Sequence, residues 1–300
     1  MEPTPEKNIA YIIASSHSGS TLLSALLGAQ AGIISLGETD VFSAESKSYR
    51  PLEERICSCQ HGNWRQCYFW QSVDQQLRQQ SGLSLDALDL SSADPQLFYT
   101  HQTAFWTAIS SVVAEPVIVD SSKKIDLYRR LVTLPFQIIP IYLVRSPFGV
   151  VYSQQKKGKN WLRESIGYLH FHMNAQLALR NQKYIHVRYE DLVSDPEACL
   201  RNILSELNQP AVHPELNWRL QVQHLLRGNS MILKKDTTIR YDDDWKYNLS
   251  WFQKAGIYCI VFPLRLRSMR FFSVYVKIHA ACKRALILFF IKFRSQDSGK

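Results

Sequence analysis

A short polar loop near the start of the chain has the residue types of an anion-binding site. Residues 14–21 read Ala-Ser-Ser-His-Ser-Gly-Ser-Thr, and leucines at helical spacing follow them. Backbone N–H groups at the start of a helix, together with the positive end of its dipole, bind phosphate or sulfate. The spacing matches a nucleotide P-loop, but that pattern needs Gly at Ala14 and Lys at Ser20. The loop therefore predicts an anion site and argues against ATP chemistry; the alternative is a capped helix after a loop of small residues.

Four short segments, the first of them apolar and β-branched, are expected to form the strands of the sheet that positions this loop. They are Asn8–Ala14, Pro116–Asp120, Ile138–Val144 and Tyr184–Arg188. Asp195 and Pro196 then supply the N-cap and first-turn proline of a helix that ends near Leu207. Strands that alternate with helices predict an α/β fold with a mainly parallel central sheet flanked by helices, where ligands bind beyond the carboxyl ends of the strands. Residues 41–115 interrupt this alternation of strands and helices, and we expect them to form a helical insertion that covers the ligand site.

Ordered motifs along the chain resemble those of sulfotransferases that use 3′-phosphoadenosine-5′-phosphosulfate (PAPS). The loop at 14–21, with Leu22-Leu23 and then Ser35-Leu-Gly-Glu38, is similar to the 5′-phosphosulfate loop of that family. Residues 145–153, Arg-Ser-Pro-Phe-Gly-Val-Val-Tyr-Ser, resemble its 3′-phosphate segment, and residues 187–196 resemble its next passage from strand to helix. The matches span most of the chain. The resemblance implies a P-loop-like sulfotransferase fold of the bacterial type with a helical insertion.

The resemblance also implies which residues bind PAPS as cosubstrate. They are His17, Ser18, Gly19, Ser20 and Thr21 at the 5′ end, and Arg145 and Ser153 at the 3′-phosphate. A late segment, His224-Leu-Leu-Arg-Gly-Asn229, resembles one that closes over the nucleotide in that family, and a basic residue after Asn229, Lys234 or Lys235, is expected to contact PAPS. The planar fork of Arg145 suits a phosphate, and a serine two helical turns later can face the same side. The alternative places Arg145 in a surface ion pair and Ser153 as a neutral helix residue. His17 stands where the family usually has Arg or Lys, so its charge would depend on pH.

Sulfuryl transfer is an in-line displacement, so the protein must remove a proton from the acceptor and stabilise charge on the departing phosphate. Glu38 lies where some relatives carry a catalytic glutamate, and we expect it to be the general base; the alternative is a surface carboxylate that caps the next helix. Lys123 is the cation expected to stabilise the transferred charge, with Lys124 as the near alternative. His17 could contact the bridging oxygen or the sulfuryl group. The chemistry requires no metal.

The acceptor would be a hydroxyl or amine of a small molecule, carbohydrate or lipid, and phenol and peptide acceptors also stay open. Its identity depends on the shape of the insertion at 41–115, which the sequence does not reveal. His170 and His172 flank Phe171 on an expected amphipathic helix, and they either approach the acceptor or serve as packing residues.

Three cysteines stand together in residues 57–67, which read Cys-Ser-Cys-Gln-His-Gly-Asn-Trp-Arg-Gln-Cys. Cys57, Cys59, Cys67 and His61 could hold zinc, although the Cys-x-Cys spacing is tighter than the usual zinc pair. Similar cysteine-rich segments that end in Phe-Trp occur in bacterial-type sulfotransferases, which implies a structural role. We rank reduced packing thiols or a local disulfide above a metal.

The formal charge of +9 is concentrated near the C-terminal end of the sequence. From Lys254 to Arg294 there are nine Lys or Arg and no acidic residue, interleaved with apolar side chains as in interfacial helices. We expect a sulfotransferase domain over 1–253 and a basic apolar tail over 254–300 that contacts a membrane surface peripherally through 254–294; the alternative is a tail packed on the sheet. No nucleic-acid-binding motif accompanies the charge, so no nucleic-acid partner is expected. Without an uncharged stretch of membrane-spanning length or a signal sequence, a cytoplasmic location is the default expectation.

Two rival function classes stay open. A P-loop nucleotide kinase or hydrolase would use the same loop, but it needs a phosphate-reaching lysine that Ser20 does not supply. A non-catalytic module would bind PAPS or another anion without transfer, and His17 would then mark the loss of catalysis.

Overall fold

The computed structural model of the chain describes residues 7–210, 216–217, 223–228 and 238–265. Lys234, Lys235 and the tail beyond residue 265 lie outside the described residues, so the expectations for them stay predictions. Within the described ranges, no helix combines the length and the hydrophobicity that a bilayer crossing requires.

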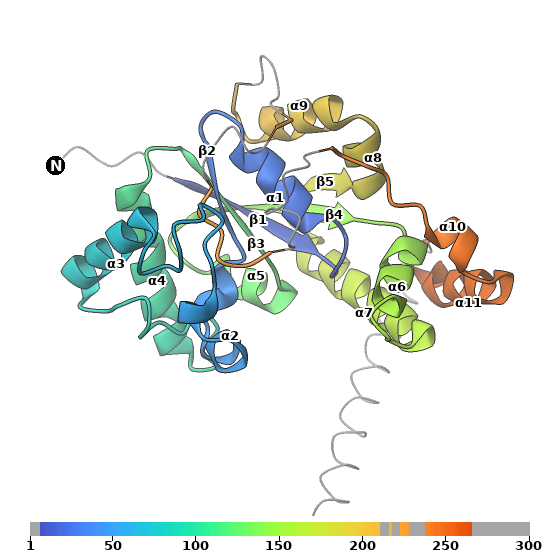
Figure 1. Cartoon of the computed structure of the whole chain (residues 1–300), viewed down its shortest axis with the longest axis horizontal. Helices are drawn as coiled ribbons and strands as arrows, with labels where there is room; N and C mark the ends of the chain where they lie inside the picture. Colours follow the sequence, from blue (N-terminus) through green and yellow to red (C-terminus); the bar gives the residue numbers. More distant parts are fainter. Residues whose placement is uncertain (1–6, 211–215, 218–222, 229–237, 266–300) are drawn as a thin grey trace, which may run out of the picture.

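A five-stranded, fully parallel sheet forms the centre of the molecule (Figure 1). The strand order is β2-β3-β1-β4-β5, with β1 at Asn8–Ala14, β2 at Ile33–Gly37, β3 at Val117–Lys123, β4 at Gln137–Val144 and β5 at Ile185–Arg188. The four strands expected from the apolar runs are confirmed, with β3 continuing to Lys123 rather than ending at Asp120. The strand β2 is additional. The α/β fold with a parallel central sheet flanked by helices is thereby confirmed.

Helices separate the strands and cover both faces of the sheet. They are α1 Ser20–Gly28, α2 Ala44–Tyr49, α3 Tyr68–Ser81, α4 Pro95–Val112, α5 Ile125–Leu131, α6 Pro147–Gln155, α7 Trp161–Leu179, α8 Tyr189–Ser194, α9 Pro196–Glu206, α10 Trp245–Asn248 and α11 Trp251–Val261. Short 3₁₀ turns lie at Thr39–Phe42 (η1), Leu52–Glu54 (η2) and Phe262–Arg265 (η4). As expected, Asp195 caps α9, because its side chain accepts a hydrogen bond from the Ala198 N–H at 3.0 Å.

The strand β1 is buried on both faces of the sheet. Its odd-numbered residues from Ile9 to Ile13 pack with α3, α4, α5 and α7. Its even-numbered residues from Ala10 to Ala14 pack with α1, α8 and α9 on the opposite face. Burial on both sides explains why the strand is a continuous apolar run without alternation.

The order of the strands opens a crevice at the carboxyl ends of β1 and β4. From β1 the chain passes through α1 to β2, towards one edge of the sheet, and from β4 it passes through α6 and α7 to β5, at the other edge. The helices α1 and α7 pack on opposite faces of the sheet. The loops after β1 and β4 therefore diverge, and such a switch point is the usual ligand site of an open parallel sheet. The loop at 14–21 and Arg145 both lie at this crevice.

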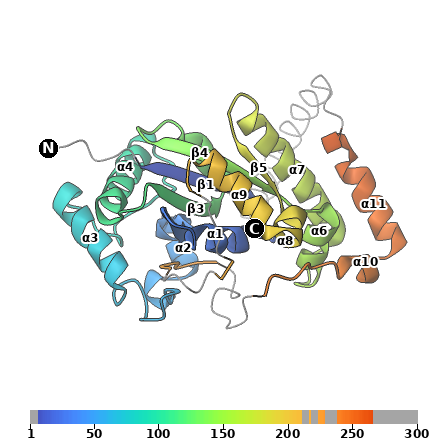
Figure 2. The ribbon, with the colours of Figure 1, turned by 90° about the horizontal axis from the view of Figure 1, so that it is seen from above.

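Helices added to the sheet lie at the two ends of the molecule. The residues of the insertion form α2, α3 and α4, and α3 and α4 lie at one end, whereas α10 and α11 lie at the other (Figures 1 and 2). Ile257 and Val261 of α11 are buried against α6 and α7. The described start of the basic tail is thus packed on the domain.

Candidate active site

A pocket of about 500 Å³ opens where β1, β3 and β4 end. Most of the residues predicted to bind PAPS or catalyse transfer line it, namely His17, Gly19, Ser20, Thr21, Glu38, Lys123, Arg145 and Ser153. Ser18 lies beneath the surface, fully buried, with its Oγ atom 2.6 Å from Ser15 Oγ. The described part of the chain therefore brings the loop after β1 and the segment after β4 into one pocket.

The loop after β1 presents the N-terminus of α1 to this pocket. Gly19 is the N-cap of α1, and it has no side-chain oxygen to cap the helix, so the positive end of the helix dipole faces the pocket. Its φ of +89° is left-handed. A Cβ at this position would come within 2.5 Å of Tyr189 Cδ2. Any other residue would both strain the backbone and displace that ring.

Arg145 joins the loop to the rest of the pocket. Its guanidinium group is buried, lies over the Tyr189 ring at 4.4 Å, and donates from Nη1 to the His17 carbonyl at 2.9 Å. Its Nη2 atom donates to the carbonyl of Asp242 at 3.1 Å and to Asp242 Oδ2 at 3.0 Å. An ion pair of Arg145 therefore exists, but it lies inside the pocket and not on an outer surface. Asp242 occupies a donor that a phosphate would need.

His17 and Lys157 lie together beside the loop. His17 Nε2 is 3.2 Å from Lys157 Nζ. Burial, and then repulsion by Lys157, Lys159, Lys123 and Arg145, lowers the pKa of His17 to about 4. The imidazole is therefore neutral at pH 7 and can accept a hydrogen bond from the lysine. Lys157, which is four residues after Ser153, supplies the positive charge that His17 lacks.

Glu38 is held between two cations. Lys123 Nζ donates a hydrogen bond to Glu38 Oε1, and Arg227 Nε forms an ion pair with Glu38 Oε2 at 3.0 Å. Only 9% of the Glu38 side chain is exposed. The side chain does not cap η1, so the capping alternative does not hold. Because both oxygens are engaged, an acceptor hydroxyl reaches this carboxylate only when one of the cations moves.

A buried carboxylate holds the ends of β2 and β3 together. Asp120 is fully buried and accepts hydrogen bonds from Thr39 Oγ1 at 2.8 Å and from Ser122 Oγ at 2.6 Å. Burial raises the pKa of Asp120 to about 6, against the hydrogen bonds from Ser122 and Thr39 that favour its charged form. Lys123, the last residue of β3, has a left-handed φ of +70°, which is uncommon for a residue other than glycine. This network places Lys123 beside Glu38.

Lys124 and the two helix histidines lie outside this pocket. Lys124 Nζ pairs with Asp40 Oδ2 at 2.9 Å, and Lys124 lines a second pocket together with His170. His172 is 1% exposed, and its Nδ1 atom lies 2.6 Å from the Tyr142 hydroxyl oxygen. The geometry therefore favours Lys123 over Lys124 as the residue beside Glu38, and His172 is a packing residue.

The insertion at 41–115 contributes no side chain to the main pocket. Every residue of that range is described, and none lines it. Glu45 and Ser91 instead line the second pocket, of about 550 Å³, with Lys124 and His170. A cover of the acceptor site by the insertion therefore stays a prediction.

Four charged residues of the pocket were missed by the sequence motifs. They are Lys157, Arg227, Arg240 and Asp242. A signal for Arg227 existed, because it lies in the late segment that resembles a nucleotide-closing region. The expectation there was a basic residue after Asn229, whereas Arg227 precedes it. The position of Asp242 could not be predicted, because none of the motifs includes an acidic residue beside the phosphate-binding arginine.

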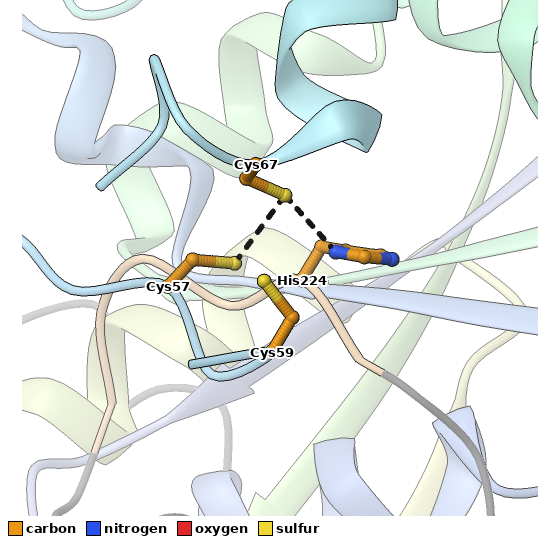
Figure 3. Close-up of side chains that lie close together, drawn as sticks. All are labelled: Cys57, Cys59, Cys67 and His224. Atoms are coloured by element: carbon orange, nitrogen blue, oxygen red, sulfur yellow. Dashed lines mark hydrogen bonds between the residues drawn. The ribbon is translucent and has the colours of Figure 1, made fainter. Parts of the chain in front are cut away.

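The cysteine segment lies apart from this pocket. Cys57, Cys59 and Cys67 are free thiols, so the local disulfide expected as one alternative is not formed. His61 is exposed and does not join them. The histidine beside the three cysteines is His224, from the late segment (Figure 3).

The comparisons with known proteins assign the chain to a family. It belongs to the sulfotransferase family, whose model matches residues 10–214. Its structure is similar to the sulfotransferase domain from the Synechococcus PCC 7002 olefin synthase, with 18% identity and a TM-score of 0.56 over 88% of this chain and 97% of that one. The sulfotransferase domain from the curacin biosynthetic pathway matches with 19% identity and a TM-score of 0.54 over 87% and 98%. No curated protein gave a significant match.

Proposed function

We propose that this sulfotransferase takes its sulfuryl group from PAPS and transfers it to a hydroxyl or amine of an acceptor. The observation that carries the proposal is the charge of the pocket. Its cations are Lys123, Arg145, Lys157, Arg227 and Arg240, and its carboxylates are Glu38 and Asp242. A pocket with such an excess of cations at a helix N-terminus suits a ligand with several negative charges, as PAPS has.

The two ends of PAPS fit the two halves of the pocket. The 5′-phosphosulfate would lie on the loop from His17 to Thr21, and the 3′-phosphate would lie at Arg145 and Ser153. The hydrogen bond from Arg145 to the His17 carbonyl, at 2.9 Å, supports this arrangement because it fixes the two halves relative to each other. The 3′-phosphate would replace the Asp242 carboxylate on the guanidinium group.

The transfer step follows from the residues around Glu38. The acceptor oxygen or nitrogen bonds to sulfur while the bond from sulfur to the 5′-phosphate oxygen breaks. The electron pair of that bond leaves on the phosphate of the product, 3′-phosphoadenosine 5′-phosphate (PAP). The acceptor proton passes to Glu38. Lys123 would move from Glu38 to the sulfuryl or leaving oxygens, which both stabilises their charge and exposes Glu38 Oε1.

A non-catalytic anion-binding module is the rival within this family. It would keep the cationic pocket and lose the transfer step. A kinase reading is disfavoured, because Ser20 stands at the position of the phosphate-reaching lysine and the chain belongs to the sulfotransferase family.

Incubation with sulfur-labelled PAPS and a host extract tests the proposal. The expected result is a labelled product that depends on the protein and identifies the acceptor. Tight binding of PAP without transfer to any component would favour the non-catalytic module. Failure to bind either PAPS or PAP would contradict the cosubstrate assignment altogether.

A further inference from the structure

Four metal-binding side chains converge at one place outside the candidate active site. The ligand atoms of Cys57, Cys59, Cys67 and His224 all lie within 4.8 Å of one another (Figure 3). Cys57 and Cys67 are fully buried, and His224 is 5% exposed. Three residues come from the loop before α3, and the fourth comes from a segment more than 150 positions later.

We propose that these three cysteines and His224 bind a structural zinc ion in a tetrahedral Cys₃His site. With Zn–S near 2.3 Å and Zn–N near 2.0 Å, the edges of such a tetrahedron are roughly 3.8 Å between sulfurs and about 3.5 Å from sulfur to nitrogen. The Cys57 and Cys67 sulfurs are 3.7 Å apart, and Cys67 Sγ is 3.1 Å from His224 Nδ1. These two distances are within about 0.4 Å of the ideal edges, and the other distances between ligand atoms, none longer than 4.8 Å, would shorten by at most about 1.3 Å around a central ion.

Backbone hydrogen bonds hold the two contributing segments together around the cluster. Ser58 N donates to the Leu225 carbonyl at 2.9 Å, and Leu225 N donates to Ser58 Oγ at 2.9 Å. Ser58 Oγ in turn donates to the Gln223 carbonyl at 2.6 Å. Residues on either side of His224 are thus fixed against a residue between two of the cysteines. The ligands are positioned by the fold, which lowers the entropy lost on metal binding.

The orientation of the histidine is fixed as well. Trp70 Nε1 donates to the His224 carbonyl at 2.7 Å. The His224 ring stacks on Phe69, with centroids 4.8 Å apart and planes 12° apart. Nδ1 faces the sulfurs as a result. A ring held in this orientation can bind a metal ion through Nδ1 without rearranging.

A disulfide is the competing explanation of this cluster. A bond between Cys57 and Cys67 would require their sulfurs to approach from 3.7 Å to about 2.05 Å. A disulfide would also not explain why Cys59 Sγ and a ring nitrogen of His224 lie beside these two sulfurs. Zinc uses all four groups, and four protein ligands leave no open position, so the site would be structural and not catalytic.

The site would support the catalytic pocket through the chain that follows His224. Arg227, three residues later, lies 3.0 Å from Glu38 Oε2 and 3.4 Å from Asp40 Oδ2. An ion that ties His224 to the loop before α3 would therefore fix the segment that carries Arg227. This effect on catalysis rests on the proposed function, whereas zinc binding itself does not.

The test measures the metal content of the full-length protein, purified under reducing conditions without a metal-affinity tag. We expect one zinc ion per chain in the wild type, and a loss of the ion in Cys67→Ser and His224→Ala. The matched controls are His61→Ala, in the same loop, and Cys199→Ser, a thiol on α9; both should retain the ion. Zinc-free protein should also unfold at a lower temperature than the zinc-bound protein, and added zinc should restore the higher unfolding temperature.

Cobalt(II) substitution keeps the proposal testable if the variants fail to fold. The wild-type protein should show the thiolate charge-transfer and d–d bands of a tetrahedral site. A wild-type chain that retains no metal after zinc supplementation would overturn the proposal. So would a Cys57–Cys67 disulfide in protein alkylated before denaturation, or equal loss of zinc from the His61→Ala control. Zinc binding by a protein that does not bind PAP would leave this proposal standing and contradict only the proposed function.

Discussion

Replacing Asp242 by Asn should strengthen the binding of PAP. Asp242 Oδ2 lies 3.0 Å from Arg145 Nη2, so the carboxylate would compete with the 3′-phosphate for the same donor. Asn keeps the backbone carbonyl that also accepts from Arg145, at 3.1 Å, and removes only the charge. The variant therefore separates the competition from the packing of the guanidinium group.

The magnitude follows from the exposure of the pair. Two unit charges about 4 Å apart interact by roughly 1 kcal/mol in water and about 4 kcal/mol at an effective dielectric constant of 20. The Arg145 side chain is 7% exposed and that of Asp242 is 34% exposed, so solvent screening places the value in the lower half of that range. Release of about 1–2 kcal/mol corresponds to a gain in PAP affinity of roughly 5-fold to 30-fold.

Calorimetric titration with PAP measures this effect. Asp243→Asn is the matched control, because Asp243 pairs with Lys246 at 3.2 Å and does not line the pocket. It should leave the affinity unchanged. The gain in Asp242→Asn should shrink at high salt and shrink again when Arg145 is also replaced. Unchanged or weaker PAP binding by Asp242→Asn would refute the competition between the carboxylate and the 3′-phosphate.

Three further predictions concern catalysis, pH and the basic tail. Glu38→Gln should lower kcat by at least about 100-fold with little change in PAP affinity. The control Glu45→Gln, which changes an exposed carboxylate, should keep full turnover. Full turnover in Glu38→Gln would exclude Glu38 as the general base. Burial lowers the pKa of His172 to about 3, so below its unfolded pKa of 6.5 the unfolded state binds a proton that the folded state does not. Between pH 7 and pH 5 the free energy of unfolding, measured in urea, should therefore fall by about 2 kcal/mol more in the wild type than in His172→Gln. An equal fall in both proteins would contradict this prediction. Seven of the nine cations from Lys254 to Arg294 follow Arg265. The full chain should pellet with anionic vesicles at low salt, and truncation after Arg265, which keeps the packed α11, should abolish the pelleting; equal pelleting of the two forms would remove the membrane role of these seven cations.

The sequence was sufficient for most of the sheet because its strands are buried. The run that became β1 is apolar, β-branched and buried on two faces, whereas β5, at the edge of the sheet, alternates the buried Ile185 and Val187 with exposed residues. The strand β2 was missed because its five residues, Ile33–Gly37, end in Ser-Leu-Gly and are too short to show a pattern. Its position next to β3 nevertheless decides where Glu38 lies.

The pocket was predictable where its residues belong to local motifs. The loop at 14–21 and the pair Arg145 and Ser153 were found because their spacing is fixed within one turn or helix. The choice between Lys123 and Lys124 was not, because it depends on the left-handed backbone of Lys123 at the end of β3. Arg227 and Asp242 reach the pocket from the chain after α9, and no local spacing relates them to Glu38 or Arg145. For the same reason, the sequence did not predict that His224 lies beside Cys57, Cys59 and Cys67.

The most direct test of the central claim, that this pocket binds the two ends of PAPS, is a calorimetric comparison of PAP binding by the wild type and Arg145→Ala. A control variant, Arg163→Ala, changes an arginine on α7 that does not line the pocket. Loss of a charge-assisted contact to the 3′-phosphate should weaken binding by about 2 kcal/mol or more in Arg145→Ala, and thermal unfolding checks that the variant is folded. The control should bind PAP as the wild type does. Equal affinity of folded Arg145→Ala and the wild type for PAP would contradict the assignment of this pocket.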